Sequence, residues 1–229
     1  MCTHKTAGDI EMKEYIKKAV IFDLDGLLID TEGISYSIYL DILRPYGQGF
    51  TLDVYLRDYS GKTLDDNISA IIRNFGLPLS VEEGKAQYAE RERFYFKNGV
   101  ALKPGARALL ARLKESGCRI VLATSSAGER ARGVLESDGI AGFFDAMVFG
   151  PEVKRGKPYP DIFIAAARKA GFGAEDCIVL EDSEAGVQAA HAAGIDVICV
   201  PDMKQPGEDF RRMAACVLPS LEDVRISAK

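Results

Sequence analysis

The sequence of 229 residues predicts an α/β protein, with a doubly wound parallel sheet and a small helical domain inserted after the first strand. Three observations lead to this prediction. The run from Ala19 to Phe22 is entirely apolar, which is typical of a strand buried on both faces at the centre of a parallel sheet. Residues 34–101 then show only helical periodicity. From residue 103 onward, predicted helices and strands alternate.

The inserted stretch contains three predicted helices, separated by turn sequences with glycine and proline. These helices are expected over residues 34–43, 64–75 and 81–96. No strand pattern interrupts them, so residues 34–101 are predicted to form a separate helical cap. The chain before it is predicted to begin with a flexible leader, residues 1–17.

The rest of the chain alternates in the order that a doubly wound sheet requires. Helices are predicted over residues 106–116, 129–137, 161–170, 185–193 and 208–213. Strands are predicted over residues 119–123, 146–149, 177–180, 196–200 and 214–218. Residues 18–33 and 102–229 are therefore expected to form one α/β core.

The composition excludes several classes of partner. A net charge of −5 offers no basic surface for nucleic acid or an anionic membrane. No apolar run approaches the length of a membrane span, and the N-terminal residues lack the apolar centre of a signal peptide. The five cysteines form no CxxC pair, which favours reduced thiols, and two histidines make a histidine-built zinc site improbable. We expect a cytoplasmic protein; its oligomeric state stays open, a monomer included.

Polar side chains follow the predicted strands at the points where those strands end. Because the carboxyl ends of parallel strands meet at one edge of a sheet, these side chains are expected to share a cleft. Each alone has a structural explanation as a helix cap, a turn residue or a solvated loop charge. Their coincidence at one edge favours a functional site. The residues are Asp23 and Asp25, Thr124, Lys157, and Glu181 with Asp182.

Two Gly-Lys pairs imitate a nucleotide-binding P-loop but fail its spacing. Upstream of Gly61-Lys62-Thr63, the position that should hold glycine is Leu56. Gly156-Lys157 is followed by Pro158, where Ser or Thr is required. A P-loop hydrolase is therefore disfavoured.

Four ordered segments resemble the motifs of the haloacid dehalogenase superfamily, in its β-phosphoglucomutase-like subgroup. They are DLDGLLIDT, LATSS, GKPYPDIF and LEDSEAGVQAAHAAGI, and the resemblance extends from about residue 18 to residue 215. It implies a Rossmann-like core with a small helical cap. It also implies a Mg²⁺-dependent phosphatase that hydrolyses a small phosphorylated metabolite, such as a sugar phosphate, through an aspartyl-phosphate.

The same resemblance assigns roles to individual residues. Asp23 is expected to be the nucleophile, and Asp25 the general acid and base. The implied Mg²⁺ ligands are Asp23, Asp182, the backbone carbonyl of Asp25, and Glu181. The implied contacts to the phosphoryl group and the substrate are Gly26, Thr124, Ser125 and Lys157 in the core, with Gly61, Lys62 and Thr63 in the cap. Glu32, Ser35 and Ser60 are further candidates at the cleft.

There are five alternatives to a phosphatase. A sugar phosphomutase of the same subgroup would carry a lysine and an arginine where this chain has Ala127 and Leu64. Dehalogenases and phosphonatases of the superfamily replace the aspartate that corresponds to Asp25, so both are disfavoured. A phospho-receiver holds its acceptor and its acidic pair on different strands. A binding protein without activity would not need all four polar clusters.

Overall fold

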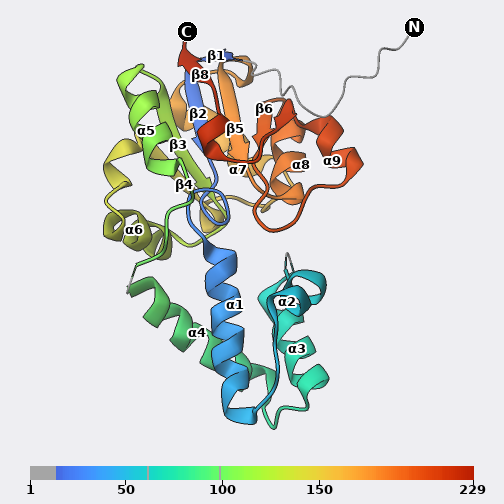
Figure 1. The fold of residues 1–229 in the computed structure, drawn as a ribbon. Helices are drawn as coiled ribbons and strands as arrows, with labels where there is room; N and C mark the ends of the chain where they lie inside the picture. Colours follow the sequence, from blue (N-terminus) through green and yellow to red (C-terminus); the bar gives the residue numbers. More distant parts are fainter. Residues whose placement is uncertain (1–13, 61, 98) are drawn as a thin grey trace, which may run out of the picture.

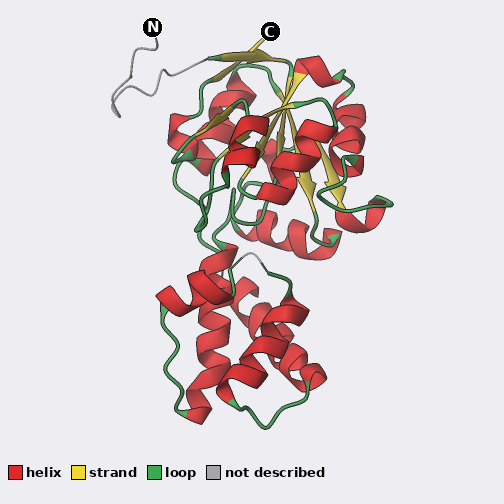
Figure 2. Cartoon of the chain, turned by 90° about the vertical axis from the view of Figure 1, so that its right-hand side faces the viewer, coloured by secondary structure: helices red, strands yellow, loops and turns green. Residues whose placement is uncertain are grey.

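The computed structural model describes residues 14–60, 62–97 and 99–229. It has an α/β lobe joined to an all-helical lobe, as Figures 1 and 2 show from two directions. The α/β lobe contains a six-stranded sheet in the order β4-β3-β2-β5-β6-β7, and every neighbouring pair is parallel. In that order the strands are Ala146–Phe149, Arg119–Thr124, Ala19–Phe22, Cys177–Glu181, Asp196–Cys199 and Cys216–Val217.

Strand β2 lies in the middle of the sheet and is buried on both faces, as its apolar sequence predicts. Val20 and Phe22 belong to one hydrophobic core, and Ala19 and Ile21 belong to the core on the opposite face. The two cores are covered by different helices, so the predicted doubly wound α/β fold is confirmed. Helices α5 (Ala106–Glu115) and α6 (Gly128–Ser137) contribute to the first core, whereas α7 (Asp161–Ala170), α8 (Glu184–Ala192) and α9 (Glu208–Met213) contribute to the second.

The helical lobe is the inserted cap, which has a hydrophobic core of its own. The aromatic side chains of Tyr39, Tyr55 and Tyr59 are fully buried there. The chain enters and leaves the cap at adjacent points: the Asp30 amide donates to the Ala101 carbonyl at 2.9 Å. The cap helices are α1 (Thr31–Leu43), α2 (Leu52–Asp58), α3 (Leu64–Phe75) and α4 (Val81–Lys97).

One helix, α2, and two strands, β1 and β8, were absent from the sequence-based prediction. Helix α2 is short, and its seven residues carry too little periodicity to be recognised. Strand β1 (Tyr15–Lys17) pairs in parallel with β8 (Ile226–Ala228) at the far end of the chain. The predicted leader of residues 1–17 is therefore too long, because Tyr15–Lys17 are part of the fold; residues 1–13 lie outside the described residues.

Among the described residues, no helix combines the length and the apolar character that a membrane span needs.

Candidate active site

The ends of three adjacent strands bring the predicted polar residues together. β2 lies between β3 and β5, so Asp23, which follows β2, is flanked by Thr124 on one side and Glu181 on the other. The Asp23 amide donates to the Leu180 carbonyl at 3.1 Å, which fixes its backbone against β5. Asp23, Thr124 and Glu181 are all buried.

The ammonium of Lys157 connects two of these carboxylates. Its Nζ lies 2.5 Å from Asp23 Oδ1 and 2.5 Å from Glu181 Oε1. The side chains of Lys157, Asp23 and Glu181 are only 7%, 8% and 1% exposed, so water screens these contacts little. A buried carboxylate pair of this kind needs a cation to compensate its charge, and Lys157 supplies one.

The charges of this cluster shift the pKa of each member. Burial raises the pKa of Asp23, with Glu181 and Asp25 adding to the rise and Lys157 opposing it. Burial also raises the pKa of Asp182, and the charge of Glu181 adds to it. Against the effect of burial, Lys157 and the donors of Ser183 hold the pKa of Glu181 below its usual range. Burial opposes the charge of Lys157, but the two carboxylates prevail and raise its pKa, so the ammonium stays charged.

Three of the carboxylates could hold a metal ion. Oxygen atoms of Asp23, Glu181 and Asp182 lie within 4.8 Å of one another, in a set that contains no nitrogen or sulfur ligand. Such an all-oxygen set suits Mg²⁺. Three carboxylates, two of them buried, lie close together with one lysine, which leaves an excess of negative charge that fits a bound cation as well. The side chain of Asp25 is not part of this set, in keeping with a contribution through its backbone carbonyl alone.

Gly26 keeps Asp182 in place because it has no side chain. Its φ is +80°, and a Cβ atom there would overlap the Asp182 carboxylate. Gly47 also has a positive φ, +64°, but no described atom lies within 4 Å of its Cβ position. We expect Gly47→Ala to lower the free energy of unfolding by about 1 kcal/mol through backbone strain alone. Gly26→Ala should lower the free energy of unfolding by about 1 to 3 kcal/mol.

The two glycine variants should differ most in metal binding. Titration calorimetry should show weaker Mg²⁺ binding for Gly26→Ala and unchanged binding for Gly47→Ala. Equal Mg²⁺ affinity in both variants would mean that Gly26 has no part in placing Asp182.

Asp25 has a different environment from Asp23. Its Oδ2 accepts hydrogen bonds from Ser126 Oγ at 2.7 Å, Arg130 Nη1 at 3.2 Å and Thr124 Oγ1 at 3.4 Å. Arg130 Nη2 lies 2.8 Å from Oδ1. The sequence alone did not identify Ser126 and Arg130 as partners of Asp25. Both are on the segment that follows β3, and the strand-end pattern points to that segment but not to which side chains turn back.

The predicted cap residues are only partly at the cleft. Lys62 and Thr63 are exposed and make local contacts: Lys62 Nζ donates to the Asp58 carbonyl at 2.5 Å, and Thr63 caps α3. Gly61 lies outside the described residues, and Ser125 is exposed next to Thr124. A cleft of about 240 Å³ instead joins Glu32 and Ser60 of the cap to motif residues of the core.

Asp202 is a further residue of this cleft that the sequence analysis missed. Its side chain is buried and pairs with Lys103 at 2.5 Å. Burial raises its pKa, and Lys103 opposes this rise. The strand-end rule could have found Asp202, because it comes soon after β6 at the same edge of the sheet.

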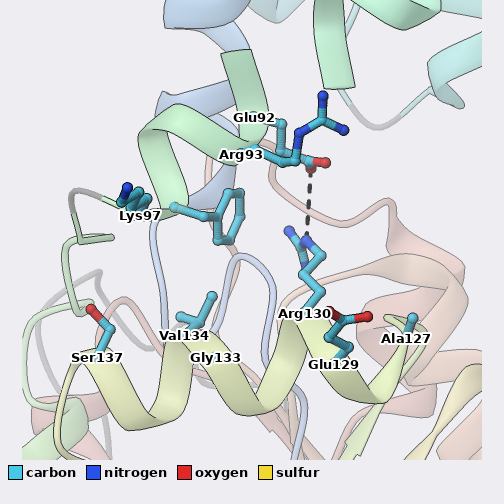
Figure 3. Close-up of a pocket in the computed structure, with 10 residues that line it drawn as sticks. Glu92, Arg93, Lys97, Ala127, Glu129, Arg130, Gly133, Val134 and Ser137 are labelled. Carbon is cyan, nitrogen blue, oxygen red and sulfur yellow. Dashed lines mark ion pairs between the residues drawn. The ribbon is translucent and has the colours of Figure 1, made fainter. Parts of the chain in front are cut away.

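A second and larger cavity, of about 600 Å³, lies between cap helix α4 and core helix α6. Figure 3 shows Arg130 rising from α6 toward Glu92 on α4, with Arg93 and Lys97 along the cap wall. Phe96 and Val134 form apolar parts of the lining. The cavity therefore begins next to the side chain that contacts Asp25.

The family follows from a comparison with protein-family models. Residues 20–200 match the model of haloacid dehalogenase-like hydrolases. The chain belongs to this family. The resemblance seen in the four motifs is thus confirmed.

Relatives and solved structures agree with this assignment. The chain is 33% identical over 181 residues to the phosphorylated carbohydrates phosphatase of Thermotoga maritima, covering 79% of this chain and 83% of that protein. It is 35% identical over 217 residues to the mitochondrial (DL)-glycerol-3-phosphatase 1 of Arabidopsis thaliana, covering 90% and 71%. The structure of a candidate β-phosphoglucomutase from Thermotoga maritima superposes with a TM-score of 0.80 and 30% identity, covering 90% of this chain and 96% of that one.

Proposed function

We propose that this protein is a Mg²⁺-dependent phosphatase that hydrolyses a small phosphorylated metabolite, such as a sugar phosphate, through an aspartyl-phosphate. The observation that carries the proposal is the buried cluster in which Lys157 contacts both Asp23 and Glu181. The printed names of two relatives, a phosphatase of phosphorylated carbohydrates and a glycerol-3-phosphatase, support the substrate class.

In the first step, a carboxylate oxygen of Asp23 attacks phosphorus, and the bond from phosphorus to the ester oxygen breaks. Asp25 gives its proton to the leaving oxygen, so the product departs as an alcohol. In the second step, Asp25 takes a proton from a water molecule that attacks phosphorus. The bond from phosphorus to Asp23 breaks, which releases inorganic phosphate and restores both carboxyl groups.

The other polar residues hold the reacting group. The Thr124 hydroxyl and the Lys157 ammonium would bind phosphoryl oxygens, together with the backbone of Ser125. Asp23, Glu181, Asp182 and the Asp25 carbonyl would hold Mg²⁺. When bound, this ion would reduce the repulsion between the carboxylates and the phosphoryl oxygens.

A screen of phosphorylated metabolites for phosphate release, with and without Mg²⁺, tests the proposal. Release of phosphate from at least one sugar or polyol phosphate, dependent on Mg²⁺, is the expected result. A protein that binds phosphorylated metabolites without releasing phosphate would be a binding protein, and the proposal would be wrong.

The acid role of Asp25 can be measured separately from the nucleophile. We expect Asp25→Asn to lower kcat for an alkyl phosphate by about 10²- to 10⁴-fold, because the amide cannot protonate the leaving oxygen. The leaving oxygen of an aryl phosphate such as p-nitrophenyl phosphate needs less protonation, so the rate of the first step with this substrate should fall far less. Burst kinetics with this substrate would separate the first step from the second. Equal losses of the first step for both substrates would contradict the acid role.

The second candidate function is a sugar phosphomutase, which the structural similarity to a candidate β-phosphoglucomutase favours. A mutase must hold a second phosphate, yet the expected lysine and arginine are replaced by Ala127, at the start of α6, and Leu64, at the start of α3. Two lost charge-assisted contacts of about 1.5 to 3 kcal/mol each would weaken the second phosphate by about 10²- to 10⁴-fold.

We therefore expect β-glucose 1-phosphate, supplied with Mg²⁺ and a bisphosphate primer, to yield inorganic phosphate and not glucose 6-phosphate. A coupled assay for glucose 6-phosphate, run beside a phosphate assay, distinguishes the two products. Efficient isomerisation with little phosphate release would identify the protein as a mutase.

A further inference from the structure

The side chain of Arg130 connects the carboxyl group of Asp25 to the cap. Its guanidinium contacts Asp25 from core helix α6, and its opposite side faces cap helix α4. Arg130 Nε lies 3.7 Å from Glu92 Oε1, and the guanidinium carbon lies 4.3 Å from the centre of the Phe96 ring. Glu92 and Phe96 both belong to α4, so residues of two lobes hold one guanidinium.

This contact differs from a surface ion pair. The side chains of Arg130 and Asp25 are 27% and 30% exposed, and the aromatic ring adds a cation–π contact to the ionic ones. Ser126 Oγ accepts a hydrogen bond from Arg130 Nη1 at 2.6 Å and donates one to Asp25 Oδ2 at 2.7 Å. Arg130 and Ser126 together therefore fix the rotation of the carboxyl group.

The two oxygens of Asp25 are held unequally. Oδ2 accepts hydrogen bonds from Thr124, Ser126 and Arg130. Oδ1 has the close ion-pair contact with Arg130 Nη2, but within the described chain no group makes a hydrogen bond to it. Oδ1 is buried and faces Arg130 Nη2, so the orientation of the whole carboxyl group depends on where the Arg130 guanidinium lies.

We propose that Arg130 is a positioning residue, which orients the carboxyl group of Asp25 and makes its placement depend on the position of cap helix α4. The inference rests on the proposed phosphatase function, in which Asp25 is the acid and base. When α4 moves relative to the core, Glu92 and Phe96 move with it, and the Arg130 guanidinium shifts against Asp25. A displacement of about 1 Å at a reacting group can reduce a rate by about 10²-fold.

The test compares three variants of the full-length protein with two substrates. Arg130→Gln keeps a polar side chain but shortens it and removes the charge. Arg130→Lys keeps the charge but loses the planar fork. Arg132→Gln is the matched control, because Arg132 is an exposed arginine on the same helix whose guanidinium lies over Phe149 and contacts Met147 Sδ. Each is assayed with glycerol 3-phosphate, or the alkyl phosphate found best in the screen, and with p-nitrophenyl phosphate.

We expect Arg130→Gln to lower kcat for the alkyl phosphate by about 10- to 10²-fold. The first-step rate for p-nitrophenyl phosphate should stay within about threefold, because that leaving group depends little on the acid. Arg130→Lys should lie between the wild type and Arg130→Gln, and Arg132→Gln should equal the wild type with both substrates. KM for the aryl ester and Mg²⁺ affinity should not change, since Arg130 contacts neither the three carboxylates that would hold the metal nor Lys157.

The connection to the cap is tested by Glu92→Gln, alone and combined with Arg130→Gln. If Glu92 acts through Arg130, the single variant shows a smaller loss with the same preference for aryl phosphate, and the double variant equals Arg130→Gln. If the fold-loss of the double variant instead equals the product of the two single losses, the connection to the cap would be overturned.

The remaining outcomes are also decisive. Equal first-step losses for alkyl and aryl phosphates in Arg130→Gln, or in Arg130→Lys should the Gln variant not fold, would overturn the positioning role while leaving the phosphatase function intact. A wild-type protein that releases no phosphate from any ester would instead overturn the phosphatase function, and this inference with it.

Discussion

Asp23→Asn is expected to abolish turnover, with a loss of about 10⁴-fold or more, because an amide cannot act as the nucleophile toward phosphorus. The same change should prevent labelling of the protein when substrate carrying ³²P is quenched in acid. Asp23 is buried next to Lys157, and an asparagine has nearly the same shape, so the fold should survive.

A control separates loss of the nucleophile from loss of structure. Asp53→Asn, at an exposed position on cap helix α2, should keep full activity and full labelling. Thermal unfolding of both variants should show cooperative transitions. Retention of wild-type activity by Asp23→Asn would rule out an aspartyl-phosphate at this position.

Removal of divalent metal should have an effect of similar size. We expect a chelator to remove essentially all activity and added Mg²⁺ to restore it, because the charges of Asp23, Glu181 and Asp182 otherwise repel a phosphate group. The burial of Asp23 also disfavours the ionised form that the reaction needs, as its raised pKa indicates. Phosphate release measured against free Mg²⁺ concentration gives the dependence directly.

The ligand role of Asp182 can be tested with two aspartates close to opposite ends of β5. Asp182→Asn should weaken Mg²⁺ binding measured by calorimetry. Asp176 lies just before β5 and contacts Lys18 and Lys229, so Asp176→Asn should leave Mg²⁺ binding unchanged.

For the chelator experiment, activity that persists without divalent metal would contradict a metal-dependent reaction.

The sequence predicts the core well because its signals are local. The apolar run Ala19 to Phe22 and the repeated helix and strand patterns identify the elements, and α3, α7 and α9 have the predicted bounds. The rule that strand ends share one edge predicts that Asp23, Thr124 and Glu181 lie close together, as the sheet order shows.

The rest depends on contacts between residues far apart in the chain. β1 pairs with β8 across nearly the whole sequence, and no local pattern specifies that partner. Whether Arg130 meets Glu92 depends on how the cap is placed on the core, which periodicity does not encode. The cap residues at the cleft were only partly predicted for the same reason: Glu32 and Ser60 line it, while Lys62 and Thr63 are occupied locally.

The adjacent entry and exit of the cap have a consequence for how the chain folds. The Asp30 amide bonds to the Ala101 carbonyl, and the Lys103 amide bonds to the Leu28 carbonyl, both at 2.9 Å, so the core holds the two ends of the insert together. For the folding of the core, the cap acts as a long loop between two core segments. The entropic cost of bringing the ends of such a loop together grows only with the logarithm of its length. Replacing the cap by a short turn should therefore change the folding of the core little. Caps of different length and shape could be exchanged at this point over evolutionary time while the core sheet stays the same.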